Sequence, residues 1–130
     1  MTTVPQGGEI RASFPAGADL SAKAGYSVEL AAGVVTACNA ATDIPFGVLA
    51  EGVVSGLQAE VIVFGPAKVV VDGAVDQGDL IGTSADGRVE KKIPGTDTTE
   101  YVIGTALETA TTAGQKISAL INCVNPHRAA

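Results

Sequence analysis

The sequence predicts an all-β protein, a small compact β-barrel or sandwich of short strands, and three observations lead to this prediction. Glycine accounts for 16 of the 130 residues, too many for helices of any length. Short runs rich in valine and isoleucine alternate with glycine, aspartate and asparagine, and their length is that of strands. Apolar residues make up 46% of the chain but aromatic residues only 4%, so small aliphatic side chains must fill the core.

The beginning of the chain predicts an extended N-terminal arm over residues 1–20, followed by a single β domain over residues 21–130. The arm is rich in proline and glycine and has few large apolar groups. Only Ile10, Phe14 and Leu20 could anchor it to a neighbouring surface. We therefore expect the arm to lie outside the core.

Nine short strands are expected in the rest of the chain, with turns between them, as in a barrel or sandwich. Asp86-Gly87 predicts a tight two-residue hairpin turn, because glycine supplies the positive φ that such a turn requires. Asp72-Gly73 is a second candidate turn, and Pro66 marks a strand bend or edge. The expected strands cover residues 26–30, 34–38, 46–51, 60–64, 68–71, 80–83, 88–93, 101–108 and 116–124.

Two segments of the chain repeat one pattern at a constant spacing. Residues 46–63 contain a strand that ends in glutamate, a turn of small residues and a second strand, and residues 103–120 repeat this order. The matching residues are Gly47 with Gly104, Glu51 with Glu108, and Gln58 with Gln115. Two such hairpins predict a pseudo-symmetric single barrel, since a solenoid needs about three repeats. The second half has a longer insertion at residues 91–100, which is expected to be an exposed loop.

Composition and charge argue against nucleic acid and membrane partners. The chain has 8 basic and 14 acidic residues, a net charge of −6, and its basic residues are scattered, whereas phosphate binding needs clustered lysine and arginine. No run approaches the roughly 18 apolar residues that span a bilayer as a helix. The first residues lack the order of a secretory signal. We therefore expect a protein made and kept in a reducing cytoplasm.

Residues that could carry catalysis or bind a metal are few. The only histidine, His127, lies close to the C-terminus, where chains usually fray. Cys38 and Cys123 belong to no CxxC pair and are expected to be buried, although a disulfide between them is an open alternative. Glu51 and Glu108 could form a carboxylate pair, but the chain has too few aromatic residues to line a sugar cleft. The sequence thus predicts no enzyme: no catalytic residues, metal, cofactor or small-molecule substrate.

A series of motifs, mostly in the second half of the chain, carries a family resemblance. The motifs are VVVDGAV at residues 69–75, QGDLIG at 77–82, DGRV at 86–89, IGTALE at 103–108 and a final apolar strand at 116–122. This order resembles the small capsid decoration, or cement, proteins of tailed phages. Residues 46–50, leading to 60–64, look like the core of the head decoration proteins of lambda-like phages. Those proteins bind the outside of the expanded head, commonly as trimers, and stabilise it.

The resemblance implies a virion structural protein on the outer surface of the capsid, made in the host cytoplasm, with the major capsid protein as partner and a homotrimer as its assembly. In this role the arm would bind the capsid by adding a strand to a neighbouring sheet. Ile10 and Phe14 would anchor it, next to Pro15, and Arg11 would pair with an acidic partner. The alternative is a phage tail or baseplate accessory binding module, for which residues 91–100 would be the recognition loop.

Overall fold

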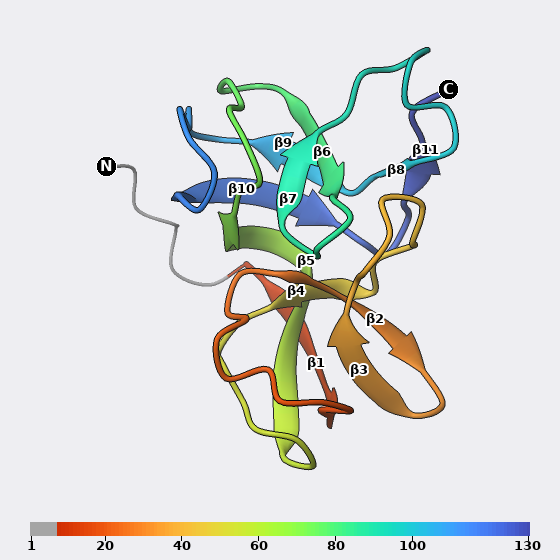
Figure 1. Cartoon of the computed structure of the whole chain (residues 1–130), viewed down its shortest axis with the longest axis vertical. Helices are drawn as coiled ribbons and strands as arrows, with labels where there is room; N and C mark the ends of the chain where they lie inside the picture. Colours follow the sequence, from red (N-terminus) through yellow and green to blue (C-terminus); the bar gives the residue numbers. More distant parts are fainter. Residues whose placement is uncertain (1–7) are drawn as a thin grey trace.

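The computed structural model describes residues 8–130, which form eleven strands and no helix (Figure 1). The all-β prediction is confirmed. Since they contain no helix, the described residues include none that could cross a membrane. The strands are β1 (Ile10–Pro15), β2 (Ser27–Ala31), β3 (Val34–Ala37), β4 (Gly47–Leu49), β5 (Gln58–Val70), β6 (Leu80–Thr83), β7 (Val89–Lys91), β8 (Tyr101–Val102), β9 (Gly104–Ala106), β10 (Lys116–Asn122) and β11 (His127–Arg128).

Nine of the strands belong to one strongly curled antiparallel sheet. Its order is β3-β2-β4-β5-β10-β9-β6-β7, and β1 pairs with the other side of β5. The two remaining strands, β8 and β11, form a small separate sheet. β5 is 13 residues long and runs through both halves of the molecule in Figure 1. Its first part pairs with β1 and β4, and its second part pairs with β10.

The molecule therefore consists of two similar halves that share β5. We call residues 8–63 the N-terminal unit and residues 64–130 the C-terminal unit. Each unit curls until its ends meet through a parallel bridge, Ala16 with Val35 in the first and Val71 with Val89 in the second. The expected pseudo-symmetry is present, and the barrel takes the form of one curled antiparallel sheet, each half of which curls around a hydrophobic cluster.

The pairing of backbone groups shows that the two units repeat one topology. Val28 pairs with Gly47 between β2 and β4, and Ile81 pairs with Gly104 between β6 and β9. The loops repeat as well, because reciprocal hydrogen bonds join residues 20 and 53 in one unit and residues 75 and 110 in the other. Only the last strand departs from the sequence repeat. Its turn is one residue longer in the second unit, so Ile62 corresponds to Leu120 rather than Ala119.

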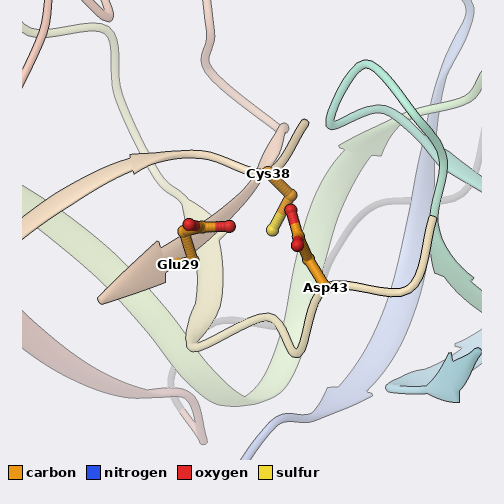
Figure 2. A group of neighbouring side chains, drawn as sticks. All are labelled: Glu29, Cys38 and Asp43. Atoms are coloured by element: carbon orange, nitrogen blue, oxygen red, sulfur yellow. The ribbon is translucent and has the colours of Figure 1, made fainter. Parts of the chain in front are cut away.

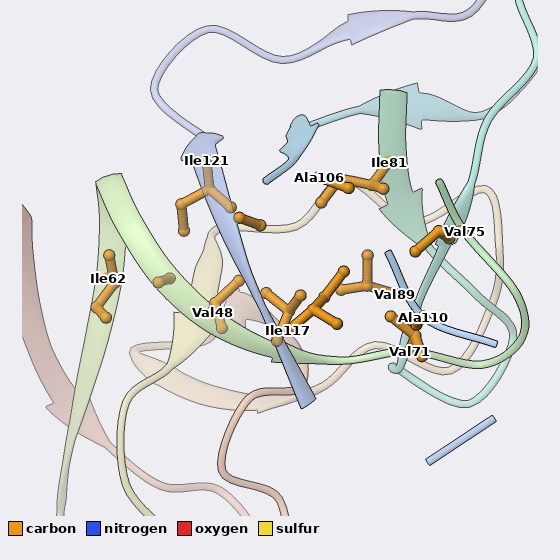
Figure 3. Packing of buried hydrophobic residues seen from close by; sticks show 13 residues of the cluster. Val48, Ile62, Val71, Val75, Ile81, Val89, Ala106, Ala110, Ile117 and Ile121 are labelled. Carbon is orange, nitrogen blue, oxygen red and sulfur yellow. The ribbon is translucent and has the colours of Figure 1, made fainter. Parts of the chain in front are cut away.

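Each unit has its own hydrophobic core, and most core positions correspond. Leu20, Val28 and Val35 of the first core occupy the places that Val75, Ile81 and Val89 occupy in the second. The second core also contains Val48 and Ile62, which come from the outer face of the N-terminal unit (Figure 3). The N-terminal unit is thus packed against the interior of the C-terminal unit.

The expected N-terminal arm differs from the structure over the described part. Residues 10–15 form β1, and Ala16 and Leu20 are each only 2% exposed in the core of the N-terminal unit. The segment has the alternation of a strand, since Ile10, Ala12 and Phe14 alternate with polar residues, but the surrounding prolines and glycines led to the prediction of an arm. The ladder to β5 is backbone pairing that composition does not reveal. Residues 1–7 of the expected arm lie outside the described residues.

Several boundaries also differ from the sequence prediction. The strands expected at residues 60–64 and 68–71 are one strand, which accommodates Pro66 opposite Leu120 and bends at Gly65, where φ is +108°. The strand expected at residues 101–108 is divided at Ile103, whose N–H donates to the carbonyl of Ile81.

The two predicted turns have different outcomes. Gly87 has a φ of +88° in the hairpin between β6 and β7, as expected. Hydrogen bonds from Ser84 to Arg88 and from Gly87 to Ser84 give this hairpin a three-residue loop, however, rather than the two-residue loop we predicted. Asp72-Gly73 is no hairpin turn, because β5 and β6 are not neighbours in the sheet.

Candidate functional site

The four residues expected to bind the capsid all lie in β1, in two different environments. Ile10 is 57% exposed and Arg11 is also exposed at the beginning of the strand. Phe14 instead packs against the core of the N-terminal unit, where its ring contacts Phe46 edge to face at a centroid distance of 5.6 Å. Pro15 is half-buried next to it. The structure thus leaves Ile10 and Arg11 available for a partner and assigns Phe14 to the core.

One side of β1 is open to strand addition. Among the described residues β1 pairs with β5 alone, and the chain bridges to β3 only after the strand has ended, at Ala16. Exposed strand edges of this kind accept an extended segment of a partner through main-chain hydrogen bonds. β1 is therefore a candidate contact edge.

An exposed apolar surface lies on the outside of the C-terminal unit. Leu120 of β10 is directly opposite Pro66 of β5 on one side and Thr105 of β9 on the other. Thr105 in turn is opposite Leu80 of β6, and Phe64 lies two residues before Pro66 on β5, on the same face. Directly paired residues share one face of a sheet. We call this set, Phe64, Pro66, Leu80, Thr105 and Leu120, the open face.

The exposure of the open face is high for side chains of this type. Leu120 is 49% exposed and Phe64 is 41% exposed. Ile10 extends this surface beyond Phe64, its partner in the β1–β5 ladder. A recess of about 130 Å³ lies beside it, lined in part by Leu80, Thr105 and His127. Contiguous exposed apolar surface of this kind marks interaction sites.

A cluster of titratable groups lies on the outside of the N-terminal unit. Glu29 of β2, Cys38 after β3 and Asp43 of the following loop point toward one another in Figure 2, and their ligand atoms all lie within 4.8 Å. Asp43 also accepts hydrogen bonds from the backbone N–H groups of Asn39 and Ala40, at 3.0 and 3.1 Å. Residue types and geometry of this kind could hold a divalent cation.

The pKa values of two members of this cluster are shifted upward. A hydrogen bond to Asp43 raises the pKa of Glu29, and burial adds to the rise. Burial, together with the two carboxylates, raises the pKa of the Cys38 thiol to about 12. Both shifts favour the protonated forms of these two groups. The buried, free state expected for Cys38 and Cys123 is confirmed.

The C-terminal unit uses the same position differently. Lys92 corresponds to Cys38, because their N–H groups donate to equivalent strand residues, Leu80 and Ser27. The side chain of Lys92 is fully buried and its ammonium group donates to the carboxylates of Glu90 and Glu100. A cation therefore neutralises two carboxylates in the second unit, whereas the corresponding place in the first unit holds a thiol beside two carboxylates.

The other residues considered for chemistry are apart from these features. His127 is exposed in β11. Glu108 accepts a hydrogen bond from the N–H of Ser118 at 2.7 Å and forms an ion pair with Lys68. Glu51, its counterpart in the repeat, is exposed. The repeated glutamates thus have different environments and do not form a pair.

Sequence reasoning missed the open face and the buried Lys92. A signal for the first was present, since Leu120 interrupts the polar positions of a strand whose alternate residues, Ile117, Ala119 and Ile121, are buried. For Lys92 the doublet Lys91-Lys92 gave no indication of which side chain is enclosed.

Comparison with solved structures gives one informative likeness. The chain is similar to the N base of the head fiber gp8.5 of bacteriophage phi29, with a TM-score of 0.60 and 21% sequence identity. The similarity covers 88% of this chain and 95% of that one. At this identity the likeness is one of fold. No protein-family model matches the chain, and no curated protein matches it.

Proposed function

We propose that this chain is a structural protein of a phage virion, which binds the outside of the head and stabilises the capsid lattice. The observation that carries the proposal is the fold, shared with the base of a phage head fiber over nearly the whole of both chains. The capsid decoration motifs point to the same class of particle. The partner would be the major capsid protein, and the assembly on the head a homotrimer.

The contact edge fits this role. The edge of β1 offers unpaired backbone groups, with Ile10 as an apolar anchor and Arg11 as a charge. In a chain of net charge −6, an exposed arginine at the edge is the natural partner for acidic groups of another protein. Binding by shape and backbone pairing needs no catalytic group, cofactor or metal.

The direct test is to mix purified protein with expanded heads that lack it and to sediment the heads. We expect saturable binding at a fixed number of copies per head. Heads that carry the protein should also resist heating better than bare heads, since a ligand that binds only the assembled lattice stabilises it. Absence of binding to heads, with binding to tails or baseplates instead, would support the alternative accessory module.

A charge reversal tests the β1 edge. Arg11→Glu should weaken head binding about tenfold, which corresponds to about 1.4 kcal/mol. Lys116→Glu is the matched control, because it makes the same charge change at an exposed residue of β10. Equal loss in both variants would indicate a general electrostatic effect. No loss in Arg11→Glu would remove β1 from the interface.

A further inference from the structure

The internal repeat allows each surface of one unit to be compared with its counterpart in the other. On the outside of the N-terminal unit, Val48 of β4 and Ile62 of β5 are directly opposite each other. Both are buried, 1% and 6% exposed, because the C-terminal unit covers them. On the outer face of the C-terminal unit, the corresponding pair is Thr105 of β9 and Leu120 of β10.

In the C-terminal unit, this corresponding surface is the open face, and no part of the described chain buries it. Leu120 is 49% exposed where its counterpart Ile62 is 6% exposed. The sequence nevertheless keeps large apolar side chains there, with Phe64 and Leu80 on either side of Leu120. In this fold the outer face of such a hairpin is therefore a packing surface. The face around Ile62 is covered by the other unit, whereas the face around Leu120 is covered by no described residue.

The charges around the open face favour a cover made by the same protein. Its five residues are uncharged, and at its border Lys68 and Glu108 form an ion pair with each other. Two copies with a net charge of −6 repel each other through most of their surface. An uncharged apolar face is the surface through which they can approach without that repulsion.

We propose that the open face is the surface through which a second copy of this chain packs. In the homotrimer, the open faces of the copies meet around the threefold axis, with Leu120 nearest the axis and the ion pair of Lys68 and Glu108 at the rim. The contact buries apolar surface in a closed cyclic assembly. This inference takes the number of copies, three, from the proposed virion role. The association itself can be measured without heads.

The test is the molar mass of the full chain over a range of protein concentrations, by sedimentation equilibrium. The wild type should form a multiple of the monomer mass, and Leu120→Asp should raise the midpoint concentration of association tenfold or more, because it places a charge in the centre of the contact. Leu57→Asp is the matched control, since Leu57 is 59% exposed in a turn of the N-terminal unit. It should associate like the wild type.

A second measurement does not depend on removing Leu120. Thr105→Cys introduces a reactive thiol on the open face, whereas the two native thiols are buried and burial raises the pKa of each to about 12. A spin label at residue 105 should then report a short distance between copies. A wild type that stays monomeric up to roughly 100 μM, or a Leu120→Asp variant that associates normally, would overturn the proposal.

Binding to heads separates this proposal from the proposed function. If Leu120→Asp leaves the molar mass unchanged and abolishes head binding, the open face contacts the capsid and the proposal of a second copy is wrong, while the virion role stands. If Leu120→Asp becomes monomeric and still sediments with heads, association and head binding use different surfaces, as proposed.

Discussion

The two units have the same strand order but fill their interiors in different ways. The core of the N-terminal unit consists entirely of its own residues, and an edge-to-face contact between Phe14 and Phe46 completes it. The core of the C-terminal unit is completed instead by Val48 and Ile62 of the other unit. The difference shows that two units with the same topology need not both form a complete core from their own residues. The second unit needs the first, whereas the first has a closed core of its own.

The buried Lys92 offers the largest test of this comparison, because only the C-terminal unit has such a group. Lys92→Ala should destabilise the protein by about 3–5 kcal/mol, since it removes one partner of a buried ion pair. Lys92→Met should cost less, because it keeps the volume of the side chain. The corresponding substitution in the first unit, Cys38→Ala, should cost about 1 kcal/mol. Urea denaturation measures all three, and an equal loss at both positions would contradict the comparison.

The next test concerns the side chains of the N-terminal unit that pack into the core of the C-terminal unit. Ile62→Ala should cost about 2–4 kcal/mol, as expected for a buried aliphatic side chain. Its counterpart on the open face is exposed in a single copy, so Leu120→Ala should change monomer stability by less than about 0.5 kcal/mol. Hydrogen exchange should locate the effect of Ile62→Ala in β9 and β10 more than in β2 and β3. Uniform loss of protection would mean that the two cores open together.

The contact between the two phenylalanine rings tests how the N-terminal unit completes its core. A double-mutant cycle with Phe14→Leu and Phe46→Leu should give a coupling energy of about 0.5–1.5 kcal/mol, the usual range for an aromatic pair. Melting curves of the four proteins provide the numbers. A coupling near zero would show that the rings act only by filling volume.

Titration gives the smallest effect, and its sign differs between the units. A hydrogen bond to Asp43 raises the pKa of Glu29, so its contribution to stability is fully present below the ordinary value of 4.5 and is lost as pH rises through the folded pKa. At neutral pH the free energy of unfolding of Glu29→Gln should therefore exceed that of the wild type by up to about 0.5 kcal/mol. In acid the two proteins should be equally stable.

Asp86 in the C-terminal unit provides the opposite case. A hydrogen bond from Arg88 lowers the pKa of Asp86, so its contribution is present above 3.8 and is lost as pH falls. Asp86→Asn should be less stable than the wild type at neutral pH, and the difference should begin to narrow as pH falls below 3.8. Melting temperatures between pH 3 and pH 8 compare both variants directly, and parallel curves for the two would contradict the assigned shifts.

The fold class and the repeat could be predicted because local backbone packing requires particular residues, and these residues are visible in the sequence. A side chain on Gly47 would lie 2.4 Å from Val61, and one on Gly104 would lie 2.3 Å from the carbonyl oxygen of Leu120. Both hairpins therefore require glycine at the same place, which makes the repeat visible in the sequence. The closure of each unit around its own core was not visible, since it depends on bridges between residues far apart in the chain, such as Val71 and Val89.

The capsid contact of the four β1 residues stays a prediction. Ile10 and Arg11 are exposed, whereas Phe14 packs against the core because its ring contacts that of Phe46. For the open face, the apolar Leu120 at an otherwise polar position of β10 was the signal within the strand. Its exposure could not be predicted, because it depends on which outer face the neighbouring unit covers.

The shared strand β5 has a mechanical consequence. At about 3.3 Å per residue its 13 residues give a backbone roughly 40 Å long that belongs to both units, with no linker between them. A force along this strand loads its ladders to β1, β4 and β10 in shear, so that many hydrogen bonds resist together rather than opening one after another. The pair of units should therefore behave as one stiff body, which cannot bend at a hinge and is pulled apart only by breaking the sheet itself.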